Sequence, residues 1–254
     1  MELVILCGFA FLAGFIDSIV GGGGLIQLPA LLAILPQAPV VLMLGTNKVA
    51  SCMGTSVATY QYARQIPLPW KDLLPAAVVA FALSFTGARV VSLIDATSLR
   101  PLIILLLIAI LIYVSIRKDF GSVQALKGTA LQRRWLGILF AGVIGFYDGF
   151  FGPGTGSFLI FAFIGILGMN FITASASSKV INLATNLAAI VYFAATGNIN
   201  FMLAIPMGFF NIMGAVAGTR MAMLKGSKFV RVLFIVVVCG IILKLIYDLL
   251  TAVH

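Results

Sequence analysis

Long runs of apolar residues, separated by short stretches rich in glycine, proline or charge, divide this chain into ten segments. In the first half the segments cover roughly 3–20, 24–36, 41–63, 72–94 and 99–116. In the second half they cover roughly 135–151, 156–168, 173–196, 201–223 and 230–250. A helix needs about 20 apolar residues to cross the hydrocarbon core of a bilayer. The pattern therefore predicts an all-α polytopic membrane protein.

Two of the segments are too short to cross a bilayer comfortably. LIQLPALLAILP and SFLIFAFIGILG are about a dozen residues long, and each follows a glycine-rich break. Irregular backbone at membrane depth is tolerated only where it is buried in protein or lines a wet cavity. We expect each half to contribute one re-entrant or broken helical hairpin and three transmembrane helices.

The two halves of the chain repeat each other. GFIDSIVGGGGL, which contains Asp17, is echoed 131 residues later by GFYDGFFGPGTGS, which contains Asp148. The same offset relates Lys48 to Lys179 and Pro75 to Pro206. Self-similarity at one fixed period is the signature of an internal repeat. The sequence predicts a first repeat at 1–116, a connector at 117–134 and a second repeat at 135–254.

Three full spans are an odd number, so the second repeat is expected to be inverted in the membrane relative to the first. Basic residues collect in cytoplasmic loops. A cytoplasmic connector at 117–134 puts four further basic residues on the same side, namely Arg64, Lys71, Lys225 and Lys228. The opposite loop at 196–200 carries no charge. We expect two inverted-topology repeats in the inner membrane, with both termini on the non-cytoplasmic side.

Composition agrees with this interpretation and excludes other classes. Of the 254 residues, 62% are hydrophobic and only 9% are charged, which cannot cover a water-soluble surface. The net charge of +9 is expected in cytoplasmic loops, and a nucleic-acid partner is excluded. Cys7, Cys52 and Cys239 form no CxxC pair, so neither a disulfide nor a metal site is expected. The N-terminus MELVILCGFAF lacks the basic start of a signal peptide, so we expect it to be retained.

The glycine-rich breaks are candidate anion sites. The half-helix after each break is expected to start near mid-membrane, where its free N–H groups and positive dipole end attract an anion. Glycine from Gly21 to Gly24, and at Gly152, Gly154 and Gly156, lets backbone amides approach a ligand. Paired broken helices form the midplane sites of many secondary transporters. In the alternative, the glycines only permit a sharp turn or a close helix crossing.

A polar face follows on the next helix of each half. Three residues share that face at i, i+3 and i+7 spacing: Lys48, Ser51 and Thr55, and then Lys179, Asn182 and Asn186. A lysine inside a span is costly in lipid, so we expect both lysines to face a cavity or the ligand. Snorkelling of the lysines to the membrane interface is the alternative.

Two further pairs of charged residues recur in both halves. Asp17 and Asp148 precede each break by about one helical turn. Each either caps the amides of the following half-helix or takes up a proton coupled to transport. Arg89 and Arg220 lie near helix ends, where they serve either as interfacial anchors or in gating and anion attraction.

Together these features resemble the TauE/SafE sulfite exporter family, also called the toluene sulfonate uptake permease family. The resemblance covers nearly the whole chain: the glycine-rich motif, the stretches TNKVAS and SSKVIN, the basic connector and their repetition. It implies transport of a small sulfur-containing anion such as sulfite, thiosulfate or an organosulfonate. It also implies a ligand-facing set: Gly22, Gly23, Gly24, Asn47, Lys48, Gly154, Gly156, Ser178 and Lys179. Thr155 lies between two of these glycines and joins the candidate site, and GPGTG departs here from the clean glycine run.

A secondary transporter, driven by an ion gradient such as that of a coupling proton or by the substrate's own gradient, is the leading hypothesis. A passive anion channel could use the same glycines and lysines, and another small anion could be the cargo. An enzyme is not expected, because the chain has no HExxH, no GxSxG and no internal histidine. No cofactor is expected. The expected partners are the anion and the lipid bilayer, and a homo-oligomer stays open.

Overall fold

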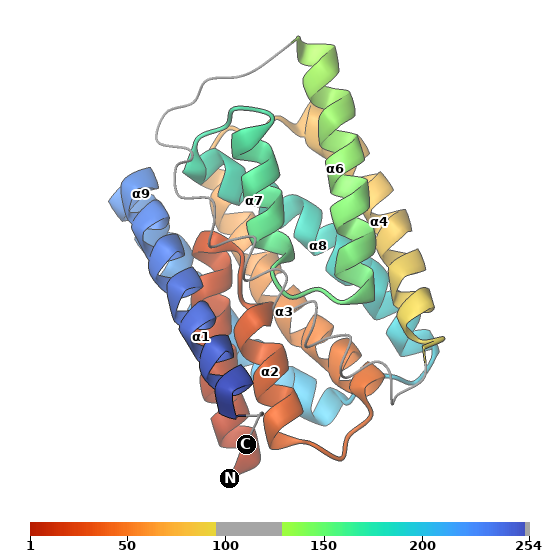
Figure 1. Ribbon diagram of the computed structural model, residues 1–254. Helices are drawn as coiled ribbons and strands as arrows, with labels where there is room; N and C mark the ends of the chain where they lie inside the picture. The colour runs from red at the N-terminus through yellow and green to blue at the C-terminus, as the bar shows by residue number, and fades with distance from the viewer. Residues whose placement is uncertain (95–128, 252–254) are drawn as a thin grey trace.

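The computed structural model describes residues 1–94 and 129–251, and within these ranges it contains α-helices and no strand. Figure 1 shows the helices as one bundle, in which the start of α1 and the end of α9 lie at the same end. The eight helices of the described residues are α1 (Glu2–Val20), α2 (Gly24–Ile34), α3 (Val40–Gln65), α4 (Trp70–Val91), α6 (Ala130–Phe150), α7 (Thr155–Gly165), α8 (Phe171–Ala195) and α9 (Phe201–Thr251). The predicted all-α class is confirmed for this part of the chain.

Helices α2 and α7 are short, as the sequence predicts. Each has 11 residues, or about 16 Å at 1.5 Å per residue, roughly half the thickness of a bilayer core. Each follows an interruption of the helical backbone at glycines with positive φ. These are Gly21 at the end of α1, and Gly152 and Gly154 between α6 and α7. The glycines thus let the chain leave one helix and start the next without a long loop.

Two predicted boundaries are wrong. The last residues of the predicted connector 117–134 are helical, because α6 begins at Ala130. Thr129 and Gln132 form a capping box that fixes this start. The predicted segments 201–223 and 230–250 belong to one assigned helix, α9, because the stretch between them holds a single glycine and no proline. The predicted span 99–116 and the rest of the connector lie outside the described residues.

The helices of the two halves correspond at the offset of the sequence repeat. Helix α7 begins and ends 131 residues after α2, and α8 begins 131 residues after α3. The packing is reciprocal: α1 lies along α9 while α6 lies along α4, and α3 packs on α9 while α8 packs on α4. In Figure 1, α1 runs away from the end of the bundle that holds the N-terminus, whereas α6 runs toward that end.

The outer surface of the bundle suits a lipid environment. Four described stretches are long and apolar enough to cross a membrane, namely α1, α4, α8 and the part of α9 up to Lys225. Large apolar side chains such as Leu74, Val78, Leu139 and Phe209 are exposed on the outside. The interior instead holds an unusual share of polar groups, including two lysines. This inversion of the soluble pattern is expected of a membrane protein with an internal polar site.

Candidate functional site

The two glycine-rich breaks touch each other at the centre of the bundle. Gly21 and Gly156 pack so closely that a Cβ on either residue would overlap the backbone of the other. The amide of Ser157 donates a hydrogen bond to the Gly21 carbonyl at 2.7 Å, which links the end of α1 to the first turn of α7. The first half and the second half are thus joined backbone to backbone at this point.

Hydroxyl groups from three helices satisfy the carbonyls at the end of α1. Tyr62 of α3 donates to Ser18 at 2.9 Å, and Ser175 of α8 donates to Ile19 at 2.8 Å. The hydroxyl of Ser157 lies 3.0 Å from the Val20 carbonyl and 2.9 Å from that of Gly21. The last carbonyls of a helix have no partner within the helix, and burying them unpaired is costly. These bonds therefore stabilise the first break.

The buried lysines pair across the two halves. Lys48 Nζ of α3 lies 2.8 Å from Asp148 Oδ2 of α6, and Lys179 Nζ of α8 lies 2.8 Å from Asp17 Oδ2 of α1. Both lysine side chains are at most 3% exposed. A buried ammonium group requires an opposite charge beside it, and here each half supplies that charge to the other. Together the four groups are formally neutral.

The two ion pairs differ in their hydrogen bonding. Asp17 accepts a hydrogen bond from Lys179, and its Oδ1 accepts a second one from the amide of Gly23 at 3.3 Å, at the start of α2. Asp148 Oδ2 lies close to Lys48, but the angles of this contact are not those of a hydrogen bond. No other group of the described residues donates a hydrogen bond to Oδ2. The side chain of Asp17 is 18% exposed and that of Asp148 is 2% exposed.

A small cavity lies between the two breaks. Its volume is about 20 Å³, which is room for about one water molecule. The lining residues are Asp17, Gly21, Gly24, Asn47, Lys48, Ser51, Asp148, Gly152, Gly154, Thr155, Gly156, Asn182 and Asn186. They come from α1, α2, α3, α6, α7 and α8 and from the break before α7. In this conformation the centre of the molecule has little free volume around its own ion pairs.

The polar groups of the cavity are only partly satisfied. Asn186 donates to Asn182 at 3.3 Å, and the Thr155 hydroxyl donates to the Gly152 carbonyl at 2.7 Å. Asn47 Oδ1 is buried and has no hydrogen-bond partner among the described residues. Gly152 lies directly against Lys48, because a Cβ there would be 2.9 Å from Nζ. Polar atoms without a hydrogen-bond partner around this small cavity indicate that the site has capacity for a ligand or water.

Most of the residues proposed from the sequence meet at this cavity, but some do not. Gly22 and Gly23 form the turn before α2 without lining the cavity, and Ser178 donates to Ser175 of its own helix. Thr55 is buried on α3 but does not line the cavity; it lies one helical turn from the part of α3 that does. Arg89 and Arg220 are exposed and lie outside the cavity lining. Gly21 and Gly152 also line it: the sequence analysis names both among the glycines of the breaks, but the set implied by the family resemblance does not include them.

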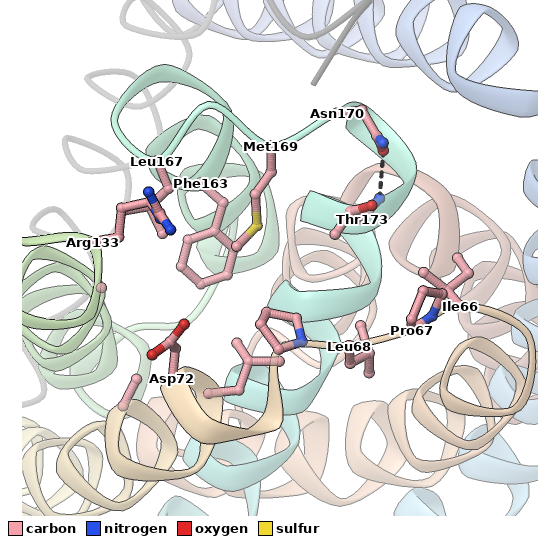
Figure 2. Close-up of a pocket in the computed structure, with 14 residues that line it drawn as sticks. Ile66, Pro67, Leu68, Asp72, Arg133, Phe163, Leu167, Met169, Asn170 and Thr173 are labelled. Carbon is pink, nitrogen blue, oxygen red and sulfur yellow. Dashed lines mark hydrogen bonds between the residues drawn. The ribbon is translucent and has the colours of Figure 1, made fainter. Parts of the chain in front are cut away.

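A larger cavity, here called the connector-end vestibule, opens where the connector joins α6. Its volume is about 560 Å³. The walls are the loop 66–69, the start of α4, the start of α6, and the segment from α7 into α8. Figure 2 shows Asp72, Arg133 and Phe163 around it, which come from three different helices, and the bond from the Thr173 amide to Asn170 that begins α8. The lining is largely apolar, with charged groups at its rim.

The opposite end of the bundle is sealed by the loop between α8 and α9. The hydroxyl of Thr46 accepts a hydrogen bond from the Asn200 amide at 3.0 Å. Gly45 packs against the backbone of Asn198, where a Cβ would overlap. At the repeat offset these positions correspond to Ser177, Pro69 and Ala176 at the connector end. Proline has no N–H to donate and alanine has a Cβ, so the same seal cannot form there.

Comparison with known proteins finds similarity over nearly the whole chain. The family model described as "Sulfite exporter TauE/SafE" matches residues 6–245. A "Probable membrane transporter protein ORF9" from Sinorhizobium sp is 35% identical over 239 residues, covering 94% of this chain and 90% of that protein. "Probable membrane transporter protein YfcA" from Escherichia coli strain K12 is 35% identical over 250 residues, covering 97% and 90%. A "Probable membrane transporter protein" from Haemophilus influenzae is 34% identical over 246 residues, covering 97% and 95%. No solved structure matches the chain.

Proposed function

The chain belongs to the sulfite exporter TauE/SafE family, and from this premise we propose that it is a secondary transporter that moves a small sulfur-containing anion across the inner membrane. The cargo class is sulfite, thiosulfate or an organosulfonate. One observation carries the proposal: a buried lysine and the starts of two half-helices meet at one central cavity, and a second buried lysine lies beside it.

The electrostatics of the cavity favour an anion. The N-termini of α2 and α7 contribute positive dipole ends, and the lysines contribute full charges. A sulfonate or sulfite group presents several oxygen acceptors, which charged and backbone donors bind with hydrogen bonds of about 1.5–3 kcal/mol each. The carboxylates of Asp17 and Asp148 occupy the lysines in the closed state. An entering anion competes with these carboxylates for the same ammonium groups.

We further propose that the chain is built from two inverted-topology repeats. The support is the offset of 131 residues shared by sequence and helices, the opposite directions of α1 and α6, and the reciprocal packing. In this arrangement the connector is cytoplasmic and both termini are non-cytoplasmic. Inverted repeats give a transporter two related conformations, each open to one side, around a fixed central site.

The connector-end vestibule is the route from the cytoplasm in this proposal. The seal formed by Thr46 and Asn200 closes the other side. Because the central cavity has room for about one water, the cargo enters only after the helices around it move apart. A site that must open and close around each anion is the property of a carrier, whereas a channel keeps a continuous pore.

Transport in reconstituted vesicles tests this function. The purified protein is placed in proteoliposomes, and uptake of labelled sulfite, thiosulfate and methanesulfonate is measured against labelled phosphate and chloride. We expect saturable uptake of at least one sulfur anion, and transient accumulation against its gradient when the vesicles are preloaded with the unlabelled anion. Non-saturable flux without such counterflow would establish the passive anion channel instead. Preference for phosphate or chloride would establish another small anion as cargo.

The role of the central lysines is tested in the same vesicles. Lys48→Met with Asp148→Asn removes one ion pair without leaving a buried charge, and we expect the anion affinity to fall roughly ten- to hundredfold. Lys71→Met provides the matched control, because Lys71 is an exposed lysine at the start of α4 outside the cavity lining. Equal affinity in both variants would show that the central lysine does not bind the cargo.

A further inference from the structure

We propose that Asp148 carries one proton with each transported anion, and that Asp17 stays ionised as part of the fold. The inference rests on the proposed anion transport and deepens it, because it names the coupling ion and the residue that holds it. It is carried by the inequality of the two ion pairs, which the repeated sequence gives no reason to expect.

The first step of the argument concerns charge balance. In the closed state the two lysines and two aspartates are formally neutral, and all four side chains are at most 18% exposed. A net charge in a site this buried is costly. An anion that enters with a single negative charge therefore requires one positive charge to enter with it. A proton taken up by a carboxylate restores neutrality and at the same time releases a lysine to bind the anion.

The second step identifies the carboxylate. Asp17 is held by a hydrogen bond from Lys179 and by the Gly23 amide, which fix its charged form at the start of α2. Neutralising Asp17 weakens two bonds and removes the cap of a half-helix. The Oδ2 atom of Asp148 has only the Lys48 contact among the described residues, and that contact lacks hydrogen-bond geometry. Protonation of Asp148 therefore costs the protein fewer interactions than protonation of Asp17.

The third step concerns the groups that face Asp148. Lys48 faces it from α3, and Asp17 shares the same cavity from α1. Asn182 and Asn186 face the cavity from α8, and both are neutral. Tyr147, the neighbour of Asp148 on α6, donates its hydroxyl to the Pro153 carbonyl and so does not stabilise the carboxylate. Two carboxylates at one small cavity repel each other, and a proton on one of them relieves this repulsion.

The fourth step concerns a place for the proton. A protonated carboxyl group is a donor and needs an acceptor. Asn47 Oδ1 lines the same cavity, is buried, and has no donor among the described residues. The cavity that Asp148 lines therefore also contains an unused acceptor. The balance of the step is simple: one proton binds one Asp148 oxygen, Lys48 leaves Asp148, and the anion takes its place beside Lys48.

The test uses proteoliposomes with two probes that stay fully ionised at neutral pH, methanesulfonate and thiosulfate, so that any proton moving with them is carried by the protein. For the monovalent probe, a pH difference of one unit should drive about tenfold accumulation in the wild type. Asp148→Asn should lose this accumulation while still exchanging labelled for unlabelled probe. Asp17→Asn is the matched control. In this variant the exchange of labelled probe and the pH-driven uptake should fall by the same factor, so the ratio of uptake to exchange should equal that of the wild type.

A second measurement needs no variant. A pH-sensitive dye inside wild-type vesicles should report about one proton per methanesulfonate, and an imposed membrane potential should change uptake of divalent thiosulfate but not of methanesulfonate. Full pH-driven accumulation by Asp148→Asn, or wild-type uptake without proton movement, would overturn the inference. Loss of coupling in Asp17→Asn alone would assign the proton to the other carboxylate and also overturn it. Failure of the wild type to exchange any of sulfite, thiosulfate and methanesulfonate would refute the proposed function instead.

Discussion

Lys48 Nζ of the first half lies 2.8 Å from Asp148 Oδ2 of the second half, and the equivalent residues, Lys179 and Asp17, form the reciprocal pair. Each lysine thus has its counter-ion on a helix of the other half. Neither half forms one of these ion pairs by itself. The consequence is that the polar centre exists only when the two halves are packed together, so folding and formation of the site are the same event.

Removal of a single lysine is expected to destabilise the protein. In Lys48→Met the carboxylate of Asp148 stays buried without a partner, which typically costs about 3–5 kcal/mol. The measurement is the unfolding temperature in detergent micelles. Adding Asp148→Asn to Lys48→Met should recover most of the lost stability, whereas no recovery would mean that the pair is not the cause.

The contact between the two breaks predicts a strong effect of one methyl group. Gly156→Ala should prevent folding or lower the unfolding temperature severely, because the added Cβ meets the backbone of Gly21, which cannot move aside. Gly8→Ala is the control at another helical glycine, where no atom lies within 4 Å of the new Cβ. That change should stabilise α1 by about 0.5–1 kcal/mol. Similar behaviour of the two variants would contradict the close contact.

The unequal ends of the bundle predict different effects at two corresponding positions. Thr46→Val keeps the side-chain shape but leaves the Asn200 amide without its acceptor, at a cost of about 1–3 kcal/mol. Ser177→Ala, at the repeat-related position, removes a buried hydroxyl that has no partner among the described residues, so stability should stay the same or rise. Thermal unfolding of both variants decides the matter. The stabilising bond at Thr46 is refuted if both substitutions lower the unfolding temperature by the same amount.

Topology is tested with reporters that are active on one side of the membrane only. Alkaline phosphatase fused after His254 should be active, and green fluorescent protein fused there should be dark, because both termini are expected outside the cytoplasm. Fusion within the connector at Gly121 should give the reverse result. A cytoplasmic reading after His254 would refute the inverted arrangement of the repeats.

The helical architecture could be predicted because apolar runs and glycine breaks have local physical causes. The lengths of α2 and α7 follow from the distance between a glycine-rich break and the next turn, both visible in the sequence. The end of α6 was placed within one residue for the same reason. The start of α6 was missed, since the capping box of Thr129 and Gln132 lies in a stretch that composition marks as linker.

Many residues of the candidate site could be predicted from the sequence, but the pairs that they form could not. The lysines and aspartates stand out because charges are rare here and recur at one offset. Which lysine meets which aspartate depends on how the helices of the two halves pack together, and no local pattern encodes that packing. The inequality of Asp17 and Asp148 was also invisible, because it arises from the Gly23 amide and from side-chain angles.

The backbone contact of Gly21 with Gly156 has a mechanical consequence. The touching backbones of Gly21 and Gly156, together with the hydrogen bond from the Ser157 amide, form a fixed point between the two half-helices α2 and α7. Each half-helix can tilt about this point. Each half-helix is about 16 Å long, so a rotation of about 10° about the fixed point would displace its far end by about 3 Å while the centre hardly moves. Three ångströms is close to the diameter of a water molecule. In the proposed transport cycle, small tilts of these half-helices would therefore move their far ends without breaking the bond between the two breaks.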